Sequence, residues 1–114
     1  SSEFRRVENQ IKEYDNQLAS LKEEKESLEA ELTELNAKLN SQKQDLDNLN
    51  NGDSAEEYQR AATAYNVQVE IYNAKVERVR EVVDEYNSLV EKRNSEALSA
   101  KSLADKLNAN AEER

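Results

Sequence analysis

Apolar residues in the first half of the chain recur at alternating steps of three and four residues. We call these positions the seam; they run without a break to residue 49, and 12 of the 14 are apolar. A repeat of 3.5 residues sustained over this length predicts a helix that packs against another helix as a left-handed coiled coil. The first seam comprises Phe4, Val7, Ile11, Tyr14, Leu18, Leu21, Lys25, Leu28, Leu32, Leu35, Leu39, Gln42, Leu46 and Leu49.

The second half of the chain repeats the pattern in another phase. Continuing the first register would place Asp53 and Glu56 in the seam, so the phase changes near residue 52 and two helices are predicted. Arg93 is the only charged member of the second seam. This seam comprises Ala55, Tyr58, Ala62, Tyr65, Val69, Tyr72, Val76, Val79, Val83, Tyr86, Val90, Arg93, Ala97, Ala100, Ala104, Leu107 and Ala111.

Turn-forming residues gather where the phase changes. Residues 50–54 read Asn-Asn-Gly-Asp-Ser and include Gly52, the only glycine of a chain without proline. Glycine can adopt the left-handed conformation that closes a helix, and Ser54 with Glu57 reads as a capping box that opens the next one. We expect a first helix over about residues 3–50, a turn over 51–54 and a second helix over about 55–112.

The two seams match if the chain folds back at this turn. Facing positions of a hairpin have residue numbers with a constant sum, which here is 104, so that Leu39 faces Tyr65 and the large Phe4 faces the small Ala100. The sequence therefore predicts an all-α fold, a long two-helix antiparallel coiled-coil hairpin that forms one domain over residues 1–114 of a larger protein. A swapped dimer of two continuous helices makes the same layers and is the alternative.

Three polar residues, Lys25, Gln42 and Arg93, interrupt the apolar seams. Single polar residues at such positions commonly fix the register at some cost in stability, while their aliphatic stems pack and their heads reach water. We expect these three to specify the register, with a binding role as the lesser alternative. The same register brings Glu31 near Lys75, which predicts an ion pair across the seam.

Composition and charge restrict the function. The chain has 25 acidic and 16 basic residues, a net charge of −9, whereas nucleic-acid binders need a basic stripe. It has no His, no Cys and no glycine-rich phosphate loop, and a helix pair offers no water-excluding site that would shift the pKa of a catalytic group. We expect no enzymatic activity and no cofactor, and no membrane insertion by this segment, because no apolar run is long enough.

Acidic residues lie close to the predicted turn, and Asp53, Glu56 and Glu57 are candidate contacts at this tip. A calcium-binding loop aligned on the single glycine would need ligands from Leu49 and Tyr58, which cannot supply them, so no metal site is expected. Helix capping and solubility explain the acids more simply. The alternative function is a binding module, such as an adaptor or a secretion substrate, that acts through this tip.

Apolar residues beside the second seam suggest a partner. Val82, Leu89 and Leu103 widen the apolar stripe on one side of the second helix, and Leu107 lies beyond the last layer that the first helix can fill. Because a two-helix seam does not need this width, the stripe suggests packing against a third or fourth helix. We predict a self-association or partner surface here, in a homodimer or four-helix bundle; ordinary partial exposure is the alternative.

The second helix also carries a short repeat, Tyr-Asn-x-x-Val, which begins at Tyr65, Tyr72 and Tyr86. This repeat resembles coiled-coil stalk segments of bacterial envelope-associated proteins, in which such arms join a membrane anchor to a working domain. The resemblance covers residues 64–94, implies a bacterial spacer and carries no functional residues to this chain. The expected function is a structural spacer or assembly arm that binds helical partners, in the cell envelope or the cytoplasm.

Overall fold

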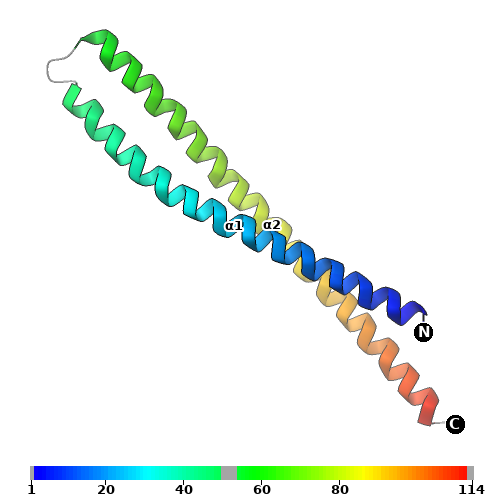
Figure 1. Ribbon diagram of the computed structural model, residues 1–114. Coiled ribbons are helices and arrows are strands. Elements are labelled where there is room, and N and C mark those ends of the chain that lie inside the picture. The colour runs from blue at the N-terminus through cyan, green and yellow to red at the C-terminus, as the bar shows by residue number, and fades with distance from the viewer. Residues whose placement is uncertain (1, 50–53, 113–114) are drawn as a thin grey trace. The chain divides into compact units, whose positions relative to one another are not determined.

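The chain folds as two long helices (Figure 1). The computed structural model describes residues 2–49 and 54–112, with α1 at Ser2–Leu49 and α2 at Ala55–Glu112. These bounds differ from the expected ones by no more than about a residue, within the usual uncertainty of helix ends. The predicted all-α antiparallel hairpin is confirmed. The proposed turn residues Gly52 and Asp53 lie outside the described residues.

Ser54 caps the start of α2. Its Oγ accepts the backbone N–H of Glu57 at 3.2 Å, and its carbonyl oxygen accepts the N–H of Tyr58 at 3.1 Å. These bonds satisfy two of the amide groups that a helix N-terminus leaves without an intrahelical partner. Glu56 and Glu57 lie in the first turn, where their charge complements the helix dipole. The side-chain cap that the capping-box pattern predicted at Ser54 is therefore present.

The contacts divide the hairpin into two compact units. The first unit joins Ser1–Glu24 to Val82–Arg114, and the second comprises Lys25–Glu81. Each unit pairs one segment of α1 with one segment of α2. Such a division follows from the fold, because a residue in a two-helix pair contacts only its neighbours along the pair, as in other quasi-one-dimensional structures.

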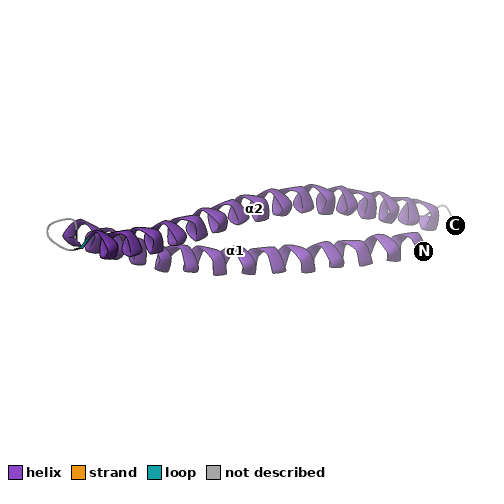
Figure 2. Cartoon of the chain, turned by 90° about the horizontal axis from the view of Figure 1, so that it is seen from above, coloured by secondary structure: helices purple, strands orange, loops and turns teal. Residues whose placement is uncertain are grey.

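The segments of the first unit run antiparallel. Val7 shares a groove with Leu103, and Leu21, further along α1, shares one with Leu89, which is earlier in α2. Figures 1 and 2 show the N-terminal part of α1 beside the C-terminal part of α2. As residue numbers rise along α1, those of their neighbours on α2 fall, as the constant-sum rule requires.

The second unit shows the same antiparallel order. Lys75 Nζ donates to Glu31 Oε2 at 2.7 Å, and Leu35 borders a groove together with Ile71. The ion pair between Glu31 and Lys75 predicted from the register is therefore confirmed. Its two side chains are 47% and 31% exposed, so it stabilises the pairing only modestly.

The first seam is covered along almost its whole length. Thirteen of its 14 residues are half-buried or buried. The exception is Lys25, which is exposed and places its Nζ 3.2 Å from Glu29 Oε1 on the same helix. The prediction that Lys25 lies in the core is wrong, because its flexible stem carries the ammonium group out to water and to a neighbouring carboxylate.

The buried face of α2 is wider than that of α1. Between residues 61 and 104 the second seam is half-buried throughout, and so is a further line of residues at seven-residue spacing beside it, except that Val82 is fully buried. At the equivalent positions of α1 only Gln10 and Glu24 are half-buried. We call the α2 residues the third line: Ala61, Gln68, Lys75, Val82, Leu89, Glu96 and Leu103.

Complete burial is confined to very few side chains. Among the described residues, Val7 and Val82 form the fully buried apolar core, each with 1% of its surface exposed. Both belong to the first unit. The pairing of the helices therefore depends on many half-buried side chains, because each contributes in proportion to the apolar area it removes from water.

Candidate interaction groove

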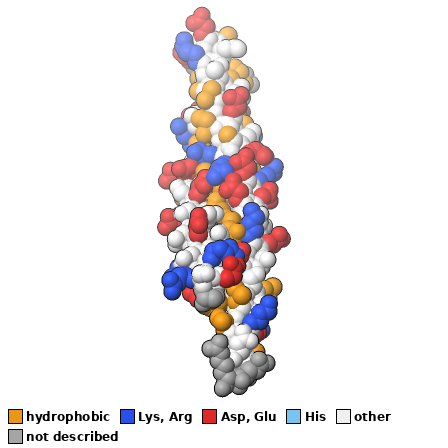
Figure 3. Space-filling view, turned by 90° about the vertical axis from the view of Figure 1, so that its right-hand side faces the viewer, with side chains coloured by type: hydrophobic (Ala, Val, Ile, Leu, Met, Phe, Trp, Pro, Cys, Tyr) orange, Lys and Arg blue, Asp and Glu red, His pale blue; other side chains and the backbone are white. Residues whose placement is uncertain are grey.

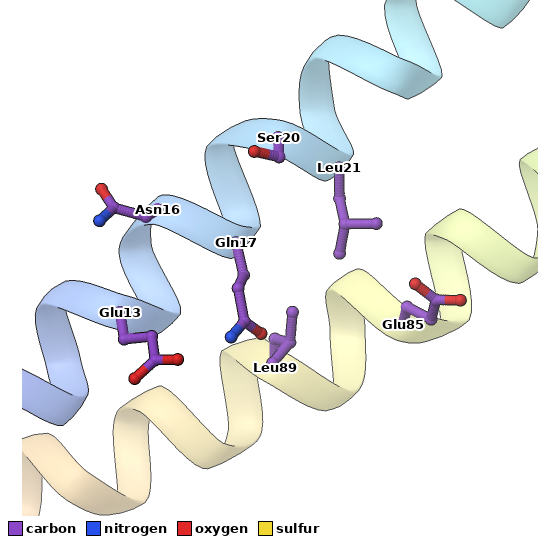
Figure 4. A pocket seen from close by; sticks show the side chains of 7 residues that line it. All are labelled: Glu13, Asn16, Gln17, Ser20, Leu21, Glu85 and Leu89. Atoms are coloured by element: carbon purple, nitrogen blue, oxygen red, sulfur yellow. The ribbon is translucent and has the colours of Figure 1, made fainter.

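A surface groove lies between α1 and α2 in the first unit (Figure 4). Its volume is about 390 Å³, and its apolar part is formed by Leu21 of α1 and Leu89 of α2, each of which points toward the other helix. Gln17 extends from α1 alongside Leu89. The remaining lining residues are Glu13, Asn16, Ser20 and Glu85. We call this the Leu89 groove.

Local sequence explains why the groove exists. Leu89 belongs to the third line of α2, so it points past the seam toward the flank of α1. The nearest lining residues of α1 include Asn16, Gln17 and Ser20, which are polar, uncharged and too small to cover a leucine. Leu89 is therefore only half-buried. Apolar side chains left in this state beside a polar rim are typical of surfaces that bind another helix.

The groove continues along α2. An adjoining groove of about 430 Å³ shares Gln17, Glu85 and Leu89 and adds Asp84, Ser88 and Lys92. The charged residues around both are Glu13, Asp84, Glu85 and Lys92. Three carboxylates against one ammonium group give the rim a negative local charge, which favours a partner with basic residues at its edges.

The four residues predicted to form a partner surface have different environments. Val82 is only 1% exposed, so the prediction that it contacts a partner is wrong: it packs inside the hairpin because α1 covers the third line at this point. Leu89 and Leu103 are half-buried, and Leu107 is 45% exposed. Leu103 borders a separate groove of about 290 Å³ near Glu3 and Arg6.

The tip residues form no comparable site in the described part of the chain. Glu56 and Glu57 are exposed in the first turn of α2, and Asp53 lies outside the described residues. The described residues hold no group of three or more side chains that could bind a metal ion. Within the same residues, neither helix has a stretch apolar enough to cross a membrane.

Two ion pairs neutralise charge in the first unit. Arg93 Nε donates to Asp15 Oδ1 at 2.9 Å, and this hydrogen bond, reinforced by the carboxylate charge, raises the pKa of Arg93 above its ordinary value. Arg6 donates to both carboxylate oxygens of Glu3, at 2.8 and 3.3 Å. The hydrogen bonds and then the charge of Arg6 lower the pKa of Glu3, and the same pair raises the pKa of Arg6.

Of the other polar seam residues, Gln42 remains at the seam in the second unit. It is half-buried, and its Oε1 atom is buried without a hydrogen-bond partner among the described residues. Arg93 is also half-buried at its seam position. The placement of these two residues agrees with the sequence pattern, whereas their role in fixing the register stays a prediction.

A second apolar surface lies on the exposed side of α2, in the second unit. We call it the outer line: Ala64, Val67, Ile71 and Ala74, all of them exposed. Val67 is 47% and Ile71 39% exposed. The sequence pattern drew attention to the seam and the third line, and the outer line was missed. Its signal is a short second repeat with steps of three and four residues, in a phase that the stronger seam obscures.

Charged and apolar side chains alternate closely over the surface. On the face shown in Figure 3, hydrophobic side chains appear as a broken line between acidic and basic ones. Together with the fold, this surface defines the class of the molecule as a two-helix coiled-coil hairpin. No family model matches the chain, and comparisons with curated proteins and with solved structures give no match.

Proposed function

We propose that this chain is a non-enzymatic assembly arm that sets a spacing and binds helical partners. The observation that carries the proposal is the Leu89 groove, where Leu21 and Leu89 are left partly uncovered between two helices. A third helix placed over this groove would bury both leucines, at about 25 cal/mol for each Å² of apolar surface removed from water. Binding of an amphipathic helix in an apolar groove is a common mode of recognition.

The shape and chemistry of the groove suit a helix better than a small substrate. Small-molecule sites are usually concave cavities that enclose most of the ligand and direct a few polar groups at it. The Leu89 groove lies on the surface between only two helices, and its polar lining consists of ordinary surface residues such as Asn16, Gln17 and Ser20. These features support an interaction surface.

The Tyr-Asn repeat supports a setting for the arm. Tyr65, Tyr72 and Tyr86 are half-buried at seam positions, and the asparagine after each is exposed. A repeated pair of one packed aromatic and one polar surface residue suits a regular stalk of defined length. The resemblance to bacterial envelope-associated stalks extends the proposal to a spacer in that compartment.

The test compares two surfaces within one protein. The groove variant is Leu89→Glu, the tip variant combines Glu56→Gln with Glu57→Gln, and the control is Leu98→Glu, which changes a leucine that is already 69% exposed. Each full-length variant is produced in the native cells, and the proteins that co-purify with it are quantified by mass spectrometry. Circular dichroism verifies that each variant keeps its helices.

The assembly arm predicts that only the groove variant loses partners that the wild-type protein retains. Loss confined to the tip variant would instead favour the binding module that acts through the acidic tip. Retention of every partner by all three variants would contradict the Leu89 groove as a binding surface.

A further inference from the structure

We propose that the Leu89 groove of one copy binds the outer line of a second copy of this chain. The inference rests on the proposed function, because it identifies the helix that the groove takes. Two surfaces that the hairpin leaves partly uncovered are matched: an apolar groove in the first unit, and an exposed apolar line in the second unit of another molecule.

The outer line has the spacing of a docking helix. Val67 and Ile71 are separated by one helical turn, and Ala64 and Ala74 extend the line by three residues on either side. Helices that pack into the groove of a helix pair use this alternation of three and four residues. The branched side chains of Val67 and Ile71 are 47% and 39% exposed, so docking would remove substantial apolar surface from water.

Charge complementarity identifies the second copy as the occupant. The outer line is bounded by Arg60 and Arg78, whereas the groove rim carries three carboxylates and one ammonium group. From Tyr58 to Arg80 basic residues outnumber acidic ones by four to two, although the whole chain has 16 basic and 25 acidic residues. This stretch therefore offers an apolar helical face with basic ends, which is what the acidic groove favours.

Arg78 already pairs with a neighbour, and this does not oppose docking. Its Nη1 lies 3.1 Å from Glu81 Oε2, in an exposed pair one turn apart on the same helix. Exposed pairs of this kind contribute little to stability, so the guanidinium group can exchange partners at small cost. The attraction between rim and outer line should weaken at high salt, because salt screens exposed charges.

The contact joins two different surfaces, so it is heterologous. A copy whose groove is filled still presents its outer line, and the reverse also holds. Contacts of this kind either close into a ring or continue as an open chain of molecules. We therefore expect the average mass in solution to rise steadily with protein concentration.

The experiment measures solution mass by light scattering and sedimentation velocity over a wide range of concentration. The variants are Ile71→Glu, which removes the outer line, and Leu89→Glu, which removes the groove. Each alone should stay monomeric. Mixed together they should form a 1:1 complex, because the first keeps a working groove and the second keeps a working outer line. Leu98→Glu serves as the control and should associate like the wild-type protein.

Two further variants protect the test against misfolding. Val67→Glu changes the most exposed branched residue of the outer line, and Asp84→Lys reverses a charge on the groove rim without touching the leucines. Both should weaken association while circular dichroism remains that of the wild-type protein. Association unchanged by both variants would contradict the proposed contact.

The outcomes separate this inference from the proposed function. A wild-type protein that stays monomeric at every concentration overturns the second copy as occupant, and so does a failure of the mixed variants to associate. If Leu89→Glu abolishes association and Ile71→Glu does not, the outer line is overturned while the groove stands as a binding surface. Co-purification of other proteins tests the proposed function independently of self-association.

Discussion

Arg93 of α2 donates a hydrogen bond through Nε to Asp15 Oδ1 of α1 at 2.9 Å, which links the two helices of the first unit. Arg93 holds a seam position whose neighbours along α2, Val90 and Ala97, are apolar. Its side chain is 37% exposed, so the stem contributes to the seam while the guanidinium group reaches the edge and its carboxylate partner. The charge is thus accommodated without being buried.

We expect Arg93→Leu to raise the melting temperature, because an apolar side chain at a seam position removes more surface from water than a charged one whose head must stay hydrated. Asp15→Asn should lower it slightly, since the ion pair is lost while Arg93 remains in place. Thermal unfolding followed by circular dichroism provides the measurement. Lys101→Leu, at an exposed position, is the control and should change little. A lower melting temperature for Arg93→Leu would show that the pair contributes more than the seam position.

Val82→Ala should destabilise the hairpin by about 2 kcal/mol, because the side chain is 1% exposed and its loss leaves both unburied area and a small cavity. The matched control is Val67→Ala, which makes the same change at a position that is 47% exposed and should alter stability by only a few tenths of that amount. Urea titration of both variants measures the difference. Equal effects at the two positions would contradict the burial of Val82.

Gln42→Leu should stabilise the second unit by roughly 1–3 kcal/mol, because it removes a buried carbonyl oxygen that lacks a partner and replaces it with an apolar group of similar size. Gln44→Leu changes the same residue type at an exposed position nearby and should have a much smaller effect. Denaturant unfolding reports the stability, and light scattering reports the mass. If Gln42 also fixes the register, the more stable variant should show mixed association states.

The pair formed by Glu3 and Arg6 predicts a pH dependence. Hydrogen bonding and charge from Arg6 lower the pKa of Glu3 from its ordinary value of 4.5, so the folded state holds this carboxylate ionised more firmly than the unfolded chain does. Its contribution to stability is therefore present above pH 4.5 and is lost as the pH falls through the lowered pKa. Glu3→Gln should remove this component.

Melting temperatures measured from neutral to acidic pH test this prediction. The wild-type protein should be slightly more stable than Glu3→Gln at neutral pH, and the two curves should converge in acid. Glu8→Gln, which changes an exposed glutamate on the same helix, controls for the general loss of a negative charge. Curves that stay parallel at every pH would contradict the ion pair as the cause.

The fold could be predicted from the sequence because the spacing of apolar residues records which side of each helix is buried. Leu39 and Tyr65 have no meaning as a pair until the turn near residue 52 sets the constant sum, and that turn is signalled by the single glycine. The ion pair of Glu31 and Lys75 followed from the same register. Periodicity, turn chemistry and charge all indicated one structure, as is typical of sequences that specify a single fold.

The candidate site was predicted less well, for reasons that lie in tertiary structure. The spacing showed that Val82 and Leu89 widen the apolar face of α2, but it could not show that α1 covers the first completely and the second only in part. That difference depends on how the flank of α1 lies against each residue. Lys25 failed for a simpler reason, since a long side chain at a seam position can turn outward.

The scarcity of fully buried residues has a consequence for how such a protein changes through evolution. Among the described residues only Val7 and Val82 are almost wholly enclosed, so stability is divided among many nearly equivalent layers. Selection then acts weakly on any one layer and strongly on the phase between the helices. Matched insertions or deletions of seven residues in α1 and α2 would preserve that phase, so related arms should differ in reach while keeping the same cross-section.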